Sequence, residues 1–522
     1  MGRSTFLTHD GVPVFGLYPN HTNRVTVTYT QNGKKIKDEY RIITGAVTNS
    51  YSDNRNITAL PTPKVVKVDP KFKDRLYFVN SGTRPPMGSD INWVMPKPKS
   101  ASKTAANPSG GSVPFQTVPL NYIVDSQGEF RWRWNPDVVY DGRGIDVAKR
   151  GYTMGFHPTK SGTYTFVQGQ RWYEMNFMGK IVGEYDLPRG YIDMSHASWE
   201  MPNGHILLRA AKANYLRPDG QKVHTVRDHI LEVDRSGNLI DVWDLNKILD
   251  NTRDDLIKNL DLGAVCMNVD VTAAGQKVAN EPEAPFGDAP GVGAGRNWAH
   301  VNSVAYDPSD DSIIISARHQ GVVKIGRDKE VKWILAPHTG WKNGLEKKLL
   351  TPVDKNSKPI KCTPMGECEG NFDFTYTQHA AWPSASGRGN LTVFDNGQIR
   401  HYEQPPLPDM NYSRIVEYKI DPVKMTVQQT WEFGKEKGVD WFAAITSNVQ
   451  WQKDRTRCLP SGAPWESLIP RRAPSAAFPS RTTKPRTSRC RSTCITTSRH
   501  PRTNRRTFLI LKRSLPVNFR PV

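Results

Sequence analysis

The stretch Ile230-Leu-Glu-Val-Asp-Arg-Ser-Gly-Asn-Leu-Ile-Asp-Val-Trp243 decides the fold, because it contains two apolar strands joined by a short polar turn. Glycine-containing polar turns of this length join antiparallel strands, so the stretch predicts a β-hairpin that ends on a tryptophan. The same pattern recurs in Tyr122–Trp134, Val322–Trp333 and Val416–Trp431. This recurrence indicates a fold built from repeats.

A second kind of hairpin lies between these copies, in Trp199–Leu208, Val304–Ile315 and Ala381–Phe394. Two hairpins make a four-stranded sheet, and one such sheet cannot bury both of its faces alone. Stacking the sheets radially buries them, as in the blades of a β-propeller. We therefore predict an all-β propeller spanning residues 61–456, with its last blade incomplete.

The two ends of the chain differ from the blades. Residues 1–60 show strand alternation without the blade pattern, which predicts part of a separate small β domain. The segment 457–522 contains 15 Lys and Arg against the single acid Glu466, so it carries +14 of the formal charge of +20. Its composition is typical of a disordered segment or of a change of reading frame near Thr456, rather than of a folded domain.

Charge and hydropathy exclude two classes of partner. The remaining residues carry only +6, so we expect no nucleic-acid binding. No run of about 18 apolar residues occurs, so we expect no membrane span. The first ten residues lack the apolar segment of a signal peptide, which by itself favours the cytoplasm.

Three histidines hold the same position in successive repeats, directly before the first strand of the second hairpin. They are His196, His300 and His379. Equivalent inner positions of a propeller point at one axis, so we expect the three imidazoles to meet in the central channel. Each histidine taken singly would more often cap a strand, and three together could also bind a metal ion.

Other polar residues are placed to join these histidines. Arg318 lies on the strand paired with the one that His300 begins, and a guanidinium suits a tetrahedral oxyanion such as sulfate or phosphate. Asn302 and Thr446 occupy similar positions at the starts of blades and could donate further hydrogen bonds. Together with the histidines, these arginine, asparagine and threonine side chains predict an anion-binding site on the propeller axis.

The motifs resemble those of the bacterial aryl-sulfate sulfotransferases, a periplasmic family that works without the nucleotide donor PAPS. The resemblance runs from about Asp10 to about Arg455 and is carried by Arg296–Ser303, Ser316–Lys329 and Phe372–Trp382. It implies a six-bladed propeller with a small N-terminal β domain, exported as a homodimer. It also implies a phenolic sulfate donor, a phenol acceptor and no cofactor.

By the same resemblance, His379 is the nucleophile that is transiently sulfated, and the other residues surround the transferred group: His196, His300, Asn302, Arg318 and Thr446. The chain departs from the family pattern at both ends, since a signal peptide and the start of the N-terminal domain are not seen. We therefore expect the chain as written to be poorly stable or inactive, and a version with the natural ends to work.

The chemistry fits these residue types. A neutral imidazole has one free ring nitrogen that can attack sulfur, which divides the exchange into two halves through a sulfohistidine. A neighbouring histidine can act as acid and then base, a role that we assign to His300. Arg318 and His196 would hold the sulfuryl oxygens as charge develops.

Cys362 and Cys368 flank a turn shortly before His379. In an oxidising compartment they could form a disulfide worth about 2 to 3 kcal/mol, whereas in a cytosol they would be free thiols. The pair is too small a ligand set for zinc, and we predict no metal there.

Two other functions remain open from the residues alone. One is a propeller that binds an anion without catalysis. The other is a metal-dependent hydrolase or lyase that uses the three histidines as ligands.

Overall fold

The computed structural model describes residues 14–47, 63–82, 119–135, 139, 153–168, 171–218, 220, 222–257, 293–295, 297–384, 386–403, 407–443, 445–452, 457–461, 495–499 and 506–511. These residues are mainly β-strand, and the chain divides into two compact units. One unit contains β6 to β27, and the other contains β1, β2, β5, β28 and β29, while β3 and β4 are divided between the two.

Four consecutive sheets of the larger unit are propeller blades, each built from antiparallel strands that follow one another along the chain. The first contains β6 (Met154–Pro158), β7 (Tyr164–Gln168), β8 (Arg171–Met175) and β9 (Ile181–Asp186). The second contains β11 (Ser198–Glu200), β12 (Ile206–Lys212), β15 (His229–Val233) and β16 (Leu239–Asp244). The third contains β17 (Val301–Asp307), β18 (Ser312–Ala317), β19 (Gly321–Gly326) and β20 (Val331–Leu335). The fourth contains β22 (His379–Pro383), β23 (Leu391–Asp395), β24 (Arg414–Asp421) and β25 (Thr426–Phe433).

Short elements accompany these blades. Strand β10 (Tyr191–Ile192) pairs with β12, β13 (Tyr215–Leu216) pairs with β14 (Lys222–Val223), and β21 (Thr351–Pro352) pairs in parallel with β25. The α-helix α2 spans Leu245–Ile248, and 3-10 turns span Leu345–Lys348, Arg400–Tyr402, Pro408–Met410 and Lys435–Trp441. Strand β26 (Asn448–Gln452) pairs with β27 (Arg457–Ser461), which lies beyond the predicted boundary at residue 456.

The smaller unit holds two sheets. A fifth blade has three strands, β3 (Leu76–Gly82), β4 (Pro119–Asp125) and β5 (Phe130–Arg133), although the last residues of β3 and the first of β4 belong to the larger unit. The other sheet has the order β2-β1-β29-β28, formed by β1 (His21–Gln31), β2 (Lys34–Thr44), β28 (Ile495–Arg499) and β29 (Arg506–Leu511). A 3-10 turn spans Pro70–Phe72.

Both predicted kinds of hairpin are present. The four copies that end on tryptophan form β4–β5, β15–β16, β19–β20 and β24–β25. The second kind forms β11–β12, β17–β18 and β22–β23. The prediction of a propeller with a separate N-terminal β region is confirmed, and the described residues form five blades. The exact division at residues 60 and 456 and the nature of segment 457–522 stay predictions.

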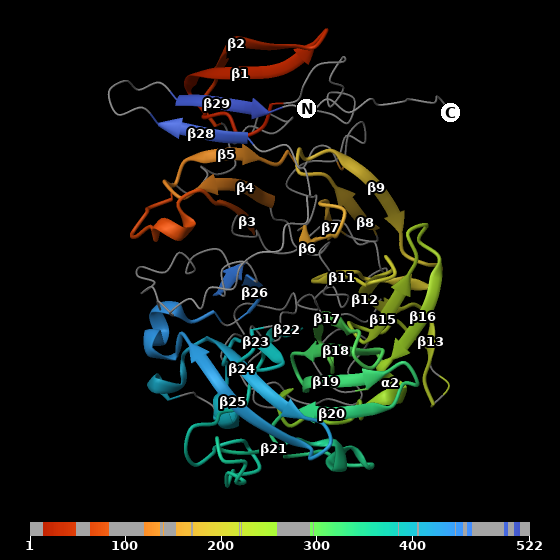
Figure 1. Ribbon diagram of the computed structural model, residues 1–522. Helices are drawn as coiled ribbons and strands as arrows, with labels where there is room; N and C mark the ends of the chain where they lie inside the picture. Colours follow the sequence, from red (N-terminus) through yellow and green to blue (C-terminus); the bar gives the residue numbers. More distant parts are fainter. Residues whose placement is uncertain are drawn as a thin grey trace, which may run out of the picture. The chain divides into compact units, whose positions relative to one another are not determined.

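The inner strands of neighbouring blades lie against one another. Strand β11 contacts β6, β7 and β17, β17 contacts β22, and β22 contacts β26. Figure 1 shows β11, β17 and β22 on the inside of the larger unit, with β16, β20 and β25 on the outside. One large apolar cluster joins the second and third blades through residues such as Leu207, Trp243 and Ile315. The core therefore lies between blades, and the starts of the inner strands are brought together.

Among the described residues, no helix is both long and apolar enough to cross a membrane.

Trp243 provides a test of how neighbouring blades are held together. Its side chain is fully buried, and its indole N–H donates to the carbonyl of Gly326 in the next blade at 2.9 Å. We expect Trp243→Ala to lower the free energy of unfolding by about 3–5 kcal/mol, because it creates a cavity between the blades. Trp243→Phe should cost less, about 0.5–1.5 kcal/mol, because it keeps most of the packing and removes one hydrogen bond from a carbonyl that still accepts the N–H of Lys329.

The measurement is urea unfolding followed by far-UV circular dichroism. Ile240→Ala is the matched control, since Ile240 lies on the same strand with half of its surface exposed. That control should change the free energy by less than about 0.5 kcal/mol. Equal losses in Trp243→Ala and Ile240→Ala would contradict a packing role for Trp243.

Candidate active site

The inner turns of three blades carry the predicted histidines. His196 lies two residues before β11, His300 lies directly before β17, and His379 begins β22. The backbone of His196 has φ 63° and that of His300 has φ 49°, a left-handed conformation that non-glycine residues rarely adopt. Such strain persists where the surrounding structure imposes it, and it is frequent at functional sites.

The structure brings the three imidazoles together. The ring centroid of His196 lies 6.1 Å from that of His300 and 6.0 Å from that of His379. His300 and His379 are buried, whereas His196 is partly exposed. Among the described residues, no group of three or more His, Cys, Asp or Glu side chains is arranged to hold one metal ion.

Arg318 links the turns of two neighbouring blades. It is fully buried, and its backbone N–H donates to the carbonyl of His300 at 3.0 Å. Its guanidinium donates to the carbonyl of Thr377 at 2.7 Å and to Oε1 of Gln398 at 2.9 Å. The predicted cation therefore lies between His300 and the turn that precedes His379.

Asn302 joins three blades, and its contacts are to backbone groups. Its side-chain amide donates to the carbonyl of Gln378 at 2.7 Å, and its own carbonyl accepts the N–H of Ala197 at 3.4 Å. Its side-chain oxygen is buried and has no hydrogen-bond partner among the described residues. This free acceptor is available to a hydroxyl or another donor in the channel.

Thr446 approaches His379 through its backbone. Its N–H donates to Nε2 of His379 at 3.2 Å, while its hydroxyl donates to the carbonyl of Ile445 at 2.7 Å. The backbone of Thr446 is also left-handed, with φ 60°. On the other side of the ring, Nδ1 of His379 lies 2.8 Å from Oδ1 of Asn396. Both ring nitrogens of the candidate nucleophile are therefore engaged.

The electrostatics keep the site histidines neutral. Burial lowers the pKa of His379 well below its ordinary value, and the charge of Arg318 lowers it further. Burial likewise lowers the pKa of His300, followed by the effect of Arg227, and the same two causes lower the pKa of His196. At neutral pH each imidazole therefore keeps a free electron pair.

Comparison with known proteins assigns this arrangement to a family. Residues 62–475 match the protein family described as arylsulfotransferase (ASST), and residues 2–45 match the family described as arylsulfotransferase Ig-like domain. The chain belongs to the arylsulfotransferase family. The N-terminal β region predicted from the sequence is the family's Ig-like domain.

Two curated relatives carry the same name, "Arylsulfate sulfotransferase AssT". The relative from Escherichia coli O6:H1 is 57% identical over 456 residues, covering 87% of this chain and 76% of the relative. The relative from Lelliottia amnigena is 54% identical over the same length and shares. The predicted assignment to the arylsulfate sulfotransferases is thereby confirmed. Among the solved structures that match is an oligogalacturonate lyase in complex with manganese, which has 9% identity and a TM-score of 0.27 over 69% of this chain and 73% of that chain.

Sequence reasoning missed two further arginines of this arylsulfotransferase site. Arg227 is buried, and its guanidinium lies 2.5 Å from Nε2 of His300. Arg209 is also fully buried, 3.5 Å from the carboxylate of Asp193. Burial lowers the pKa of Arg209 to about 10 and raises that of Asp193 to about 6. Arg209 lies on β12, where a lone arginine usually points to the surface, and Arg227 lies in the turn before β15, so no local signal marked either residue.

His319, next to Arg318 in the chain, was also missed. Its Nδ1 donates to the carbonyl of Asn297 at 2.8 Å, and its ring centroid lies 4.8 Å from that of His300. Its Nε2 is buried without a hydrogen-bond partner among the described residues. Burial lowers the pKa of His319 to about 3.

The cysteine pair is a disulfide. The sulfurs of Cys362 and Cys368 are bonded, and both residues are partly buried against the cluster between the third and fourth blades. Tyr376, in the segment between this disulfide and His379, donates its hydroxyl to the carbonyl of Met365 inside the disulfide loop, at 2.8 Å. The constrained loop therefore supports the segment that leads to His379.

The buried histidines predict how stability depends on pH. The unfolded chain has histidine pKa values of about 6.5, whereas His319, His300 and His379 titrate lower in the folded protein. Below pH 6.5 the unfolded state therefore binds protons that the folded state does not. We expect the free energy of unfolding to be flat above about pH 7 and to fall by about 1.4 kcal/mol per pH unit for each such histidine below about 6.5.

Urea unfolding between pH 7.5 and 5.5 measures this slope. Asp193, whose pKa is raised to about 6, binds a proton in the folded state in the same range and offsets up to one proton of the slope. His319→Gln should reduce the slope by about one proton. Stability that rises as the pH falls through this range would contradict burial of the neutral imidazoles.

Proposed function

We propose that this arylsulfotransferase moves a sulfuryl group from a phenolic sulfate ester to a phenol acceptor through a sulfohistidine at His379, without PAPS. The observation that carries the proposal is the placement of His379: a buried imidazole whose Nδ1 faces Oδ1 of Asn396 and whose Nε2 accepts only the 3.2 Å hydrogen bond from the N–H of Thr446. Nε2 is therefore the unprotonated nitrogen, and its electron pair becomes available to the donor sulfur when that hydrogen bond opens. Burial and the charge of Arg318 lower the pKa of His379, which keeps the ring neutral. A covalent intermediate divides one difficult transfer into two easier ones.

In the first half of the reaction, Nε2 of His379 attacks the sulfur of the donor. An N–S bond forms while the bond between sulfur and the phenolic oxygen breaks, and the phenolate leaves with that electron pair. Negative charge spreads over the sulfuryl oxygens, where Arg318 and His196 would hold it. Arg227 would donate a hydrogen bond to the departing phenolate, since a guanidinium always donates.

In the second half, the acceptor phenol attacks the same sulfur and must lose its proton. His300 is suited to take that proton, because Nε2 faces the donor group of Arg227 and is therefore the unprotonated nitrogen. The protonated His300 then releases the proton to solvent, which restores the neutral ring for the next cycle. The bond between His379 and sulfur breaks, and its electron pair returns to Nε2. Asn302, with its free side-chain oxygen, and Thr446 would orient the reacting groups.

Several finer statements belong to the same proposal. We take β26 and β27 as part of a sixth blade, because β26 lies against β22 and β23 as the other inner strands lie against their neighbours. The disulfide supports an oxidising compartment, in agreement with a periplasmic location. The homodimer rests on the family resemblance.

The main competing function is an anion-binding propeller without catalysis, which would use the same three buried arginines. It predicts a bound aryl sulfate but no covalent adduct. The metal-dependent alternative has no matching ligand group among the described residues. A chelator distinguishes it directly, since the proposed transfer requires no metal ion.

The decisive experiment traps the intermediate. We expect incubation with an aryl sulfate, without a nucleotide donor, to release phenol and to add a sulfuryl group on His379, seen by intact mass and peptide mapping. A second phenol should remove the adduct. His379→Ala should form none, and chelator should have no effect. A folded protein that binds the aryl sulfate without releasing phenol would favour the anion-binding alternative.

Arg318 is expected to act mainly in the transition state. Arg318→Met removes the cation and should lower kcat by about 10²- to 10³-fold, because charge develops on the sulfuryl oxygens during transfer. Arg318→Lys keeps the charge without the planar fork and should recover only part of the rate. Steady-state kinetics with an aryl sulfate measure both. A change confined to KM would show that Arg318 only binds the substrate.

A further inference from the structure

Asn396 directly follows β23 in the chain, and its side chain contacts the candidate nucleophile His379. Its side chain is fully buried, and its Oδ1 lies 2.8 Å from Nδ1 of His379. Its Nδ2 donates to the carbonyl of Ala443 at 2.6 Å and to the carbonyl of Thr446 at 3.0 Å. Every polar atom of this amide therefore has a partner.

These contacts fix the orientation of the amide. The carbonyls of Ala443 and Thr446 can only accept hydrogen bonds, so the atom that faces them must be the amide nitrogen. The oxygen must then face His379. An amide oxygen can only accept, so Nδ1 of His379 must carry the ring proton.

The opposite side of the ring gives the same answer independently. The N–H of Thr446 donates to Nε2 of His379, so that nitrogen must be the unprotonated one and its electron pair accepts the bond. His379, Asn396 and Thr446 thus form a closed ring of hydrogen bonds with one direction. Reversing the tautomer would place two donors together at Nε2 and two acceptors together at Nδ1.

We infer that Asn396 is a positioning residue that holds His379 in the tautomer with the proton on Nδ1 and the free pair on Nε2. The inference rests on the proposed nucleophilic role of His379. In solution a neutral imidazole exchanges its proton between the two nitrogens, so a free ring would present the wrong nitrogen part of the time. Asn396 also leaves the ring uncharged, because a neutral amide stabilises an imidazolium far less than a carboxylate does.

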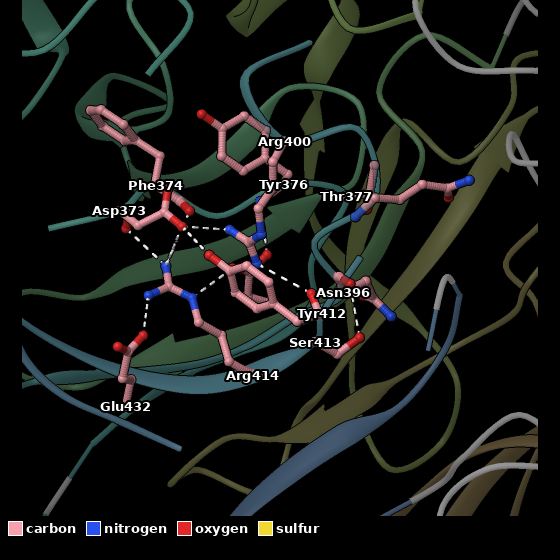
Figure 2. Close-up of polar contacts among 12 residues, drawn as sticks. Asp373, Phe374, Tyr376, Thr377, Asn396, Arg400, Tyr412, Ser413, Arg414 and Glu432 are labelled. Carbon is pink, nitrogen blue, oxygen red and sulfur yellow. Dashed lines mark hydrogen bonds and ion pairs between the residues drawn. The ribbon is translucent and has the colours of Figure 1, made fainter. Parts of the chain in front are cut away.

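The segment that carries Asn396 is itself held in place. The hydroxyl of Ser413 donates to the backbone carbonyl of Asn396 at 2.8 Å. The hydroxyl oxygen of Ser413 also accepts the N–H of Ala443 at 2.8 Å. Figure 2 shows Ser413 against Asn396, next to the ion-paired residues of the same blade. Ser413 touches the backbone of Asn396 and not the imidazole, which makes it a suitable control position.

Two variants test the inference. Asn396→Leu removes the acceptor, so we expect the rate of adduct formation on His379 to fall about 10- to 100-fold, by analogy with the loss seen when the hydrogen-bond partner of a metal-bound histidine is removed. Asn396→Asp keeps an acceptor at Nδ1 but adds negative charge, which raises the pKa of His379. A protonated ring has no free pair, so the acid limb of the kcat/KM profile should move to higher pH.

The measurements are single-turnover adduct formation and the pH profile of kcat/KM with one aryl sulfate. Ser413→Ala should lower stability without moving the acid limb, which separates positioning from folding. An Asn396→Leu protein that forms the adduct at the wild-type rate, or an Asn396→Asp profile that does not move, overturns the inference. Absence of any adduct in the wild-type protein would instead overturn the proposed function.

Discussion

The contact between inner strands of successive blades is the constraint on which the site depends. Gln378 makes three hydrogen bonds in this contact: its backbone carbonyl accepts the side-chain amide of Asn302 and the hydroxyl of Ser316, and its own side-chain amide donates to the carbonyl of Ala317. In the same contact between β17 and β22, the N–H of Ala381 donates to the hydroxyl of Ser303 at 3.1 Å. These bonds fix the starts of β17 and β22 against each other. Histidines from turns about 80 to 100 residues apart therefore meet without any long loop having to be ordered around them.

The same cations can serve the resting and the reacting site. Arg209, Arg227 and Arg318 are all fully buried, and each disfavours a charged His196. Burying such charges is costly unless a partner offsets the loss of water. In the resting site Arg209 pairs with Asp193, and Arg318 donates to Thr377 and Gln398. In the proposed reaction, the sulfuryl oxygens are a further partner for Arg318 and the departing phenolate is one for Arg227, and the arginines meanwhile disfavour protonation of the imidazoles. Binding of the anion and activation of the nucleophile therefore follow from one arrangement of charge.

The repeats could be predicted from the sequence because their signals are local. For example, the 14 residues that end at Trp243 contain the patterns that predict both strands of a hairpin and the turn between them. The position of His300 could be predicted because it directly precedes another such hairpin. Asn396 gave no such signal. It lies in Asp-Asn-Gly after a strand, a composition typical of a turn, and only the fold brings it to His379. Arg227 was missed for the same reason, since its partner His300 is 73 residues away.

The fourth blade shows how a buried ionic network can position a reactive group. Asp395, next to Asn396, accepts the N–H of Tyr376 and pairs with both Arg400 and Arg414. These two arginines also pair with Asp373, which begins the segment leading to His379 (Figure 2).

Apolar residues of similar volume often stabilise a protein as well as a buried ion pair does, so stability alone does not account for this network. Its hydrogen bonds have direction, which apolar packing lacks. They fix the segments before His379 and before Asn396 relative to each other, and the 2.8 Å contact between the two side chains depends on that relation.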